Sequence, residues 1–373
     1  MEHYVQSATV RWYNACAYYA VALARGLKAH GFRVTFVSGY ETPAVRIARS
    51  WDVDVFTVRR TPGITPLDYW RMIRAYRSFA LKNGVSLVNA HNGSDHTAWM
   101  LALAGTGIPV VRTSGNQIPP NVHPFSRSLM KKTAGVIASC NPIRAYYTGG
   151  FGMDGSLVRI INGGVDSGYF TPSHTGQLSR DDIGIPGNAF VFGILGRYSP
   201  DKGHRYFFDA AGKVAAIHPD AWFVVAGWNA QLSEHDIRSM AEKTGILDRT
   251  VFFRRLGDTR DLIGLLDVGV VASVNSETIC RVAMEYMAMC IPVIGTSTNV
   301  IPEIVRHNET GLIIPPRNPA AMAEAMEHLL SRPEEAVRMG ARGREIVESE
   351  YSLGFFARLT IDAYRSFLSL HHA

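Results

Sequence analysis

The first half of the chain alternates short apolar runs with longer segments whose apolar residues recur at helical spacing. The short runs are rich in β-branched residues and are bounded by Gly, Pro or Asn, which is typical of strands. This pattern predicts strands at residues 34–38, 55–58, 87–89, 110–113, 136–139 and 157–160. It predicts helices at residues 15–30, 66–83, 98–104 and 142–147.

The second half repeats the alternation, with apolar runs that suit strands buried on both faces. Predicted strands lie at residues 191–195, 222–226, 251–253, 268–272, 292–295 and 312–314. Predicted helices lie at residues 203–217, 281–289, 319–330 and 333–348.

Strands that alternate with helices indicate parallel sheets joined by right-handed crossovers. The predicted fold class is therefore α/β, with two doubly wound Rossmann-like domains that face a cleft. We place the first domain at residues 1–165 and the second at residues 188–352. Residues 166–187, rich in Gly, Ser, Thr and Pro, form the predicted linker, and a helix at 353–373 crosses back to the first domain.

Composition excludes several other classes of protein. Of 373 residues, 47% are hydrophobic and 19% are charged, which fits a well-buried globular chain and not a disordered one. The four cysteines form no CxxC pair, so we expect reduced thiols and a cytoplasmic protein. No apolar run approaches the roughly 20 residues that span a bilayer. No nucleic-acid-binding module is present either.

Charge is distributed unevenly between the halves. Residues 1–173 carry 18 Lys and Arg against 8 Asp and Glu, whereas residues 174–373 carry 20 against 24. Either the basic half meets an anionic surface or substrate, or its charge only keeps the protein soluble. The helix predicted at 66–83 combines Arg71, Arg74 and Arg77 with a neighbouring stripe of Trp70, Ile73, Tyr76 and Phe79. It therefore either binds a membrane at its anionic surface, or packs its aromatic stripe on the domain's own sheet.

Two loops of the second half could bind phosphate. Residues 196–203 follow a predicted strand and contain Gly196, Arg197 and Lys202, whose cations suit a pyrophosphate. Residues 273–285 follow another strand, and Ser276 or Thr278 could cap the helix after it. Glu277 precedes that helix and Glu285 lies about two turns inside it, where a buried carboxylate needs a partner.

These residues resemble family 4 retaining glycosyltransferases of the GT-B fold. The resemblance rests on the Glu277-x7-Glu285 spacing and on Gly196-Arg197 with Lys202-Gly203. Further matches occur at 162–166, 291–294, 302–305 and 311–312.

The resemblance implies a metal-independent enzyme without a cofactor that transfers a sugar from a nucleotide diphosphate donor to a hydroxyl. UDP is favoured over GDP, and lipopolysaccharide, glycolipid or other cell-surface glycan synthesis is the expected setting. Arg197 and Lys202 would hold the pyrophosphate, Glu277 the transferred sugar and Glu285 the ribose. The remaining expected donor-binding residues are Gly196, Ile279, Cys280, Arg281 and Val282.

The sequence departs from the family pattern at three glycines. The usual Glu-Gly-Phe-Gly is Glu277-Thr278-Ile279-Cys280 here, and Met289-Cys290 replaces the glycine before the Pro-Val strand. Arg281, which follows, either adds a third cation to the phosphates or pairs with Glu285 one turn on.

The first domain supplies the acceptor-site candidates. His91 follows the strand at 87–89, where the family often has histidine; it either orients a hydroxyl as a catalytic residue or is structural. Candidate acceptor-binding residues are Arg11, Trp12, Asn14, Asn92, Arg112 and Asn116. Arg11, Trp12 and Asn14 could instead cap the next helix and pack locally.

Two patterns imitate metal motifs. Asp52-Val53-Asp54 matches the Asp-x-Asp of metal-dependent transferases of another fold, but it opens a strand away from the expected cleft. Neither the His371-His372 pair nor the His91 and His96 pair has a ligand set at workable spacing. We therefore expect no metal site.

Alternative functions are a non-catalytic sugar-nucleotide or lipid-binding subunit of a glycosylation complex, and a GT-B epimerase or phosphorylase. The expected partners are the nucleotide sugar, a glycan or lipid-linked acceptor, and an anionic surface on the inner face of the membrane.

Overall fold

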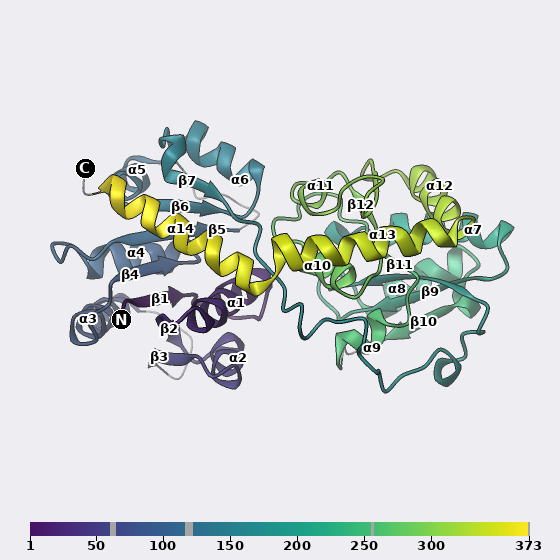
Figure 1. Ribbon diagram of the computed structural model, residues 1–373, viewed down its shortest axis with the longest axis horizontal. Coiled ribbons are helices and arrows are strands. Elements are labelled where there is room, and N and C mark those ends of the chain that lie inside the picture. The colour runs from purple at the N-terminus through teal and green to yellow at the C-terminus, as the bar shows by residue number, and fades with distance from the viewer. Residues whose placement is uncertain (60–64, 116–121, 255–256, 372–373) are drawn as a thin grey trace. The chain divides into compact units, whose positions relative to one another are not determined.

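The computed structural model describes residues 1–59, 65–115, 122–254 and 257–371 (Figure 1). The chain divides into two compact units, which are described separately here. Unit 1 comprises Met1–Gly164 and Tyr351–Ala373, and unit 2 comprises Val165–Glu350. The C-terminal segment thus belongs to the same unit as the N-terminus.

Unit 1 contains a seven-stranded parallel sheet in the order β3-β2-β1-β4-β5-β6-β7. The strands are β1 His3–Ser7, β2 Arg33–Tyr40, β3 Asp54–Arg59, β4 Leu87–Ala90, β5 Val110–Ser114, β6 Gly135–Ala138 and β7 Val158–Ile160. The order reverses between β1 and β4, which is the position where doubly wound folds bind ligands.

Helices cover both faces of this sheet. They are α1 Ala15–Ala29, α2 Pro43–Ser50, α3 Pro66–Lys82, α4 Gly93–Ala102, α5 Pro124–Lys131, α6 Asn141–Ala145 and α14 Leu353–His371. On one face, α14 packs against α1 and reaches β6 (Figure 1). On the other face, Tyr76 of α3 stacks on Trp99 of α4 with ring centroids 4.3 Å apart, above the buried side chains of Val5 and Val88.

Unit 2 contains a six-stranded parallel sheet in the order β10-β9-β8-β11-β12-β13. Its strands are β8 Phe190–Leu195, β9 Ala221–Ala226, β10 Thr250–Phe253, β11 Val268–Val271, β12 Val293–Thr296 and β13 Gly311–Ile314. The order reverses between β8 and β11, so the carboxyl ends of these two strands mark the expected ligand position of unit 2.

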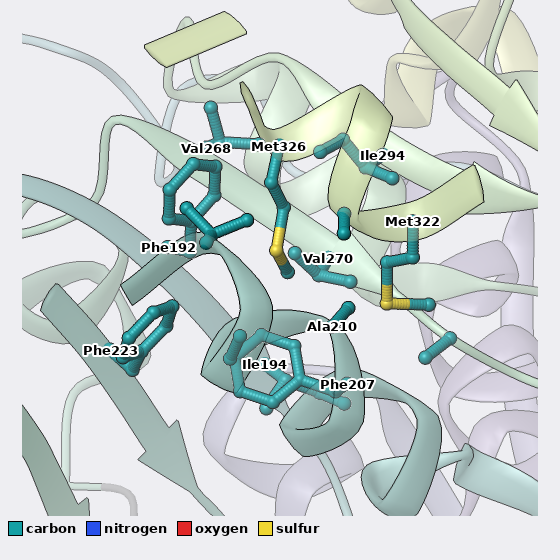
Figure 2. Packing of buried hydrophobic residues seen from close by; sticks show 14 of the residues in the cluster. Phe192, Ile194, Phe207, Ala210, Phe223, Val268, Val270, Ile294, Met322 and Met326 are labelled. Carbon is teal, nitrogen blue, oxygen red and sulfur yellow. The ribbon is translucent and has the colours of Figure 1, made fainter. Parts of the chain in front are cut away.

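The helices of unit 2 are α7 His204–Ile217, α8 Glu234–Lys243, α9 Thr259–Ile263, α10 Arg281–Ala288, α11 Ile301–Ile304, α12 Pro319–Leu330 and α13 Pro333–Ile346. Figure 2 shows the core on one face of the sheet, where Phe207 of α7 and Met326 of α12 meet Phe192 and Val270. Burial of apolar surface contributes roughly 25 cal/mol per Å² to folding stability. This core therefore stabilises the sheet from which the two candidate phosphate-binding loops extend.

The sequence pattern located most strands but missed several elements. It omitted β1, whose polar His3, Gln6 and Ser7 mask a fully buried strand. It also omitted the short helices α2, α5, α8 and α9, and it began α4 five residues too late. The segment before Ala98 is polar because Asn92 caps that helix and Asp95 lies in its first turn, so it lacks an apolar helical period.

Gly203 fixes the junction between the loop after β8 and helix α7. Its φ is +71°, in the left-handed region that favours glycine. A Cβ on Gly203 would lie 1.9 Å from the carbonyl oxygen of Ala272, at the end of β11. Only glycine therefore lets the two loops approach this closely.

We expect Gly203→Ala to destabilise unit 2 strongly, because it combines left-handed strain with a backbone clash. The expected loss is roughly 2–5 kcal/mol from the two effects together, measured by chemical denaturation. Gly187→Ala is the matched control, since no atom lies within 4 Å of its added Cβ. Equal stability of the two variants would contradict this role for Gly203.

Candidate functional site

The two charged loops of unit 2 leave the sheet at adjacent carboxyl ends, on either side of the point where the strand order reverses. The first follows β8 and runs through a single turn at Pro200–Lys202 into α7. The second follows β11 and leads to α10. The backbone N–H of Val274 donates to the carbonyl of Asp201 at 2.9 Å, so the loops are joined directly.

Arg197 presents a cation that no protein group neutralises within the described residues. The residue is half-buried, and no hydrogen bond or ion pair involves its guanidinium there. Its neighbours hold the backbone in place: Gly196 N–H donates to Ala226 O and Tyr198 N–H to Trp228 O, both at 2.9 Å. The loop thus holds an unpaired guanidinium on a fixed backbone.

Lys202 and Glu277 form a close ion pair across the two loops. Lys202 Nζ lies 2.5 Å from Glu277 Oε2, and Ser273 Oγ donates to the same oxygen at 2.7 Å. Glu277 is 9% exposed, so this charge-assisted contact is largely screened from water. Val300 N–H also donates to the Glu277 carbonyl at 3.1 Å. Ser273, which the sequence analysis did not select, therefore helps to orient Glu277.

Helix α10 begins later than the predicted caps require. Its N-cap residue is Cys280, in a left-handed conformation with φ 40° and no side-chain capping bond. The prediction that Ser276 or Thr278 caps this helix is therefore wrong. Without such a cap, the N-terminus of α10 leaves main-chain N–H donors for an anion.

Glu285 is buried and paired within α10. It is 3% exposed, and its Oε1 lies 2.8 Å from Nε of Arg281. Burial raises the pKa of Glu285 above its ordinary value, and the Arg281 charge lowers it again. Of the two roles that the sequence left open for Arg281, the pairing with Glu285 is present in the structure.

The polar edge of unit 1 lies at the carboxyl ends of β1 and β4. Asn14 caps α1 by accepting from Ala17 N–H at 3.0 Å, and Asn92 caps α4 by accepting from Asp95 N–H at 2.8 Å. Trp12 is 68% exposed, and the Arg11 guanidinium lies 5.0 Å from the centre of its ring. The sixth acceptor candidate, Asn116, lies outside the described residues.

His91 is buried at this edge in a hydrogen-bonded network. Its Nε2 lies 2.9 Å from Gln6 Oε1, an oxygen that also accepts from Asn89 Nδ2 at 3.1 Å. Nε2 must then donate, so Nδ1 of the neutral ring carries a lone pair, and Nδ1 has no partner among the described residues. Burial and then the Arg112 charge lower the pKa of His91 to about 3, which keeps the ring neutral.

The metal-like patterns have structural explanations. Lys28 Nζ pairs with Asp52 Oδ2 at 2.6 Å, and Asp54 is the first residue of β3. His96 Nε2 contacts Thr133 Oγ1 at 2.9 Å. Across the described residues, no cluster of three His, Cys, Asp or Glu could hold a metal ion, while His372 lies outside them.

Comparison with protein families accounts for both units. Residues 177–346 match the model described as glycosyl transferases group 1, and residues 17–169 match glycosyltransferase family 4. The chain belongs to the group 1 and family 4 glycosyltransferases. The resemblance inferred from the sequence is thereby confirmed.

Known structures agree on the fold of this glycosyltransferase. A glycosyltransferase from Rickettsia africae superposes with a TM-score of 0.85 at 19% identity, covering 98% of each chain. Anabaena HepE in complex with UDP and glucose gives 0.84 at 16% identity, covering 98% of this chain and 100% of HepE. The predicted pair of doubly wound α/β domains of GT-B type is therefore confirmed.

Curated relatives match over part of their length. A GDP-mannose-dependent α-(1-6)-phosphatidylinositol monomannoside mannosyltransferase of Mycobacterium tuberculosis is 27% identical, covering 70% of this chain and 71% of that protein. For eight of the curated relatives, the matched region spans between 45% and 71% of their length.

At two positions where glycine is expected, this glycosyltransferase has a cysteine whose backbone conformation is one that favours glycine. Cys280 and Cys290 stand where the family resemblance leads us to expect glycine, and their φ angles are +40° and +60°. Both cysteines thus adopt the left-handed conformation that glycine reaches without strain. The two positions therefore have a backbone conformation that suits glycine, although each has a side chain.

His204, directly after Gly203, is a buried site residue that the sequence analysis missed. It is 1% exposed, and burial followed by the Lys202 charge lowers its pKa to about 4. The sequence did contain a signal for His204, because a histidine stands at the first position of an apolar helix, directly after a cationic loop.

We expect unit 2 to lose stability as pH falls from about 6.5 towards 4, because the unfolded chain then binds a proton that folded His204 excludes. Between pH 7 and pH 5 this effect amounts to about 2 kcal/mol. His204→Phe should remove that part of the pH dependence of urea unfolding, whereas His235→Gln, at an exposed position, should retain it. An unchanged pH dependence in His204→Phe would contradict the assignment.

Proposed function

We propose that this protein is a metal-independent, retaining glycosyltransferase that moves a sugar from a nucleotide diphosphate donor to a hydroxyl acceptor. The observation that carries the proposal is the unpaired Arg197 beside the Lys202–Glu277 pair, placed where the strand order of unit 2 reverses. Doubly wound sheets bind phosphorylated ligands at that position.

Charge complementarity supports a diphosphate at these loops. Arg197 offers a planar fork, and Lys202 a compact charge, to oxygens that become more negative as the glycosidic bond breaks. The N-terminus of α10 adds main-chain donors. Fixed donors aimed at developing charge commonly supply the largest part of the rate enhancement. They would also take over the task that a divalent metal performs in other transferases.

The two glutamates have separate roles in this proposal. Glu277 binds hydroxyls of the transferred sugar, so donor binding replaces part of its contact with Lys202 and turns that cation to the phosphates. Glu285 binds the ribose, and Arg281 partly offsets the rise that burial causes in the pKa of its carboxyl. The backbone from 279 to 282 meets the distal phosphate.

UDP is the proposed nucleotide. The complex of HepE with UDP and glucose supports this choice, whereas the mycobacterial relative is named for GDP-mannose. Thermal unfolding with UDP, GDP and ADP distinguishes them, because a ligand at 100 times its dissociation constant adds about 2.7 kcal/mol.

The acceptor is assigned to unit 1. Arg11, Trp12 and Arg112 would contact it at an edge shaped by the Asn14 and Asn92 caps, and His91 would orient its hydroxyl through the lone pair of Nδ1. A lipid-linked or cell-surface glycan is the proposed acceptor class, supported by the relative named for a phosphatidylinositol mannoside.

Helix α3 keeps only part of the surface that would meet a membrane. Tyr76 is buried and Ile73 and Phe79 pack on the core, so the predicted aromatic stripe is divided. Trp70 alone of that stripe is exposed, with the Arg74 guanidinium 4.8 Å from its ring centre. Arg77 instead donates to Ala102 O at 2.8 Å. No helix in the described part of the chain is long and apolar enough to cross a bilayer.

We expect Arg197→Ala to lower sugar transfer at least 100-fold in buffer containing EDTA, because it removes charge aimed at the leaving diphosphate. Its thermal midpoint should not change, since the side chain has no described partner. Arg205→Ala is the matched control, on the exposed face of the next helix. Near-normal transfer by Arg197→Ala, or no transfer by the parent without added metal, would overturn the mechanism.

We expect the double variant Arg71→Glu and Arg74→Glu to lose binding to vesicles that contain anionic lipid, since each basic residue near such a surface contributes about 1 kcal/mol. Vesicle sedimentation at low and high salt measures the effect. Arg46→Glu on α2, also exposed in unit 1, is the control. Parent binding that ignores lipid charge would leave α3 an ordinary surface helix.

A further inference from the structure

Arg112 is a buried cation in unit 1 without a carboxylate partner. It is 2% exposed in the middle of β5, and Nη1 donates to the Ala90 carbonyl at 3.4 Å. A guanidinium has five N–H donors, and this is its one hydrogen bond among the described residues. All Asp and Glu side chains of the sequence belong to the described ranges, and none of them pairs with Arg112 there.

One buried carboxylate of unit 1, Asp95, already has other hydrogen-bond donors. Asp95 is buried at the same edge, and its Oδ2 accepts from Thr9 N–H at 2.5 Å and from Asn92 Nδ2 at 2.9 Å. No ion pair joins Asp95 to Arg112 within the described residues. A buried ion without a counter-charge is strongly unfavourable, so a charge supplied from outside the protein is the physical expectation.

Two neutral rings and a helix N-terminus also lie near the guanidinium. Its charge, after burial, lowers the pKa of both His91 and His96 to about 3, so neither ring carries charge at neutral pH. The N-terminus of the ten-residue helix α4 begins three residues after Ala90 and has the same sign as Arg112. Ser114, two residues along the same strand and therefore on the same face, has a buried Oγ without a described partner.

We propose that Arg112, Ser114 and the N-terminus of α4 bind an oxyanion, a phosphate or a carboxylate, carried by the acceptor. The acceptor identity in this statement rests on the proposed function, whereas the oxyanion site does not. The neighbouring lone pair of His91 Nδ1 accepts the hydrogen of a hydroxyl on the same molecule. The enzyme thus selects acceptors in which a reactive hydroxyl lies near an anionic group.

The oxyanion site also has a cost that can be measured. Without ligand, Arg112 is an uncompensated buried charge, so a neutral side chain of similar length stabilises the empty protein. Arg112→Met should therefore raise the thermal midpoint in the absence of anions while abolishing the response to them. A guanidinium that served only the fold would behave in the opposite way.

The test uses the full chain carrying Arg197→Ala and Lys202→Ala, so that the loops of unit 2 do not respond to phosphate. Inorganic phosphate is titrated at constant ionic strength, and binding is followed by thermal midpoint and by equilibrium dialysis of labelled phosphate. We expect one phosphate site in this background, which Arg112→Met removes and which Arg46→Met, at an exposed arginine of the same unit, retains. Glucose 6-phosphate, glucuronate and glucose as competitors distinguish phosphate, carboxylate and uncharged ligands.

The absence of a phosphate site in the Arg197→Ala and Lys202→Ala background would overturn the proposal. So would an unchanged phosphate response in Arg112→Met, or a lower midpoint or loss of folding of that variant without phosphate. Failure of the proposed function appears elsewhere, as absent nucleotide binding by the parent protein. The two failures are therefore distinguishable.

Discussion

The close approach of Gly203 to the Ala272 carbonyl is the constraint on which the candidate donor site depends. Because that contact leaves no room for a side chain, the loops after β8 and β11 meet, and Lys202 reaches Glu277. Two glycines of the strands beneath also leave no room for a side chain. Gly193 and Gly269 are paired in register, and an added Cβ would clash with Leu266 at the first and with Tyr286 at the second. Small residues at the strand reversal thus set where the charges lie.

Buried charge is balanced differently in the two units. In unit 2, Lys202 neutralises Glu277 and Arg281 neutralises Glu285, so the site is stable when empty and must exchange ion pairs for ligand contacts. In unit 1, Arg112 has no such counter-charge, and the edge of the sheet is incomplete without an anion. The first arrangement suits a donor that enters and leaves in each cycle, and the second suits selection of an acceptor by its charge.

Two departures from the family pattern have a backbone conformation that glycine adopts without strain. Cys280 and Cys290 keep positive φ angles in place of glycine, although a side chain there stores strain. Strain that the fold retains in this way commonly occurs at functional sites. Trp70 is a second unusual residue, because this apolar side chain remains exposed while other residues of the same helical stripe pack on the core.

The sequence by itself determined the alternation of strands and helices, the fold class and the family, because buried parallel strands and the Glu277-x7-Glu285 spacing are local patterns. It could not reveal β1, where Gln6 is hydrogen-bonded to the distant Tyr364. It left the role of Arg281 open, and although it placed the helix start correctly at residue 281, it assigned the cap to Ser276 or Thr278 where the structure has Cys280. The missing partner of Arg112 and the tautomer of His91 also depend on residues far apart in sequence. Tertiary structure decided these points, because burial and counter-charge are properties of neighbours in space.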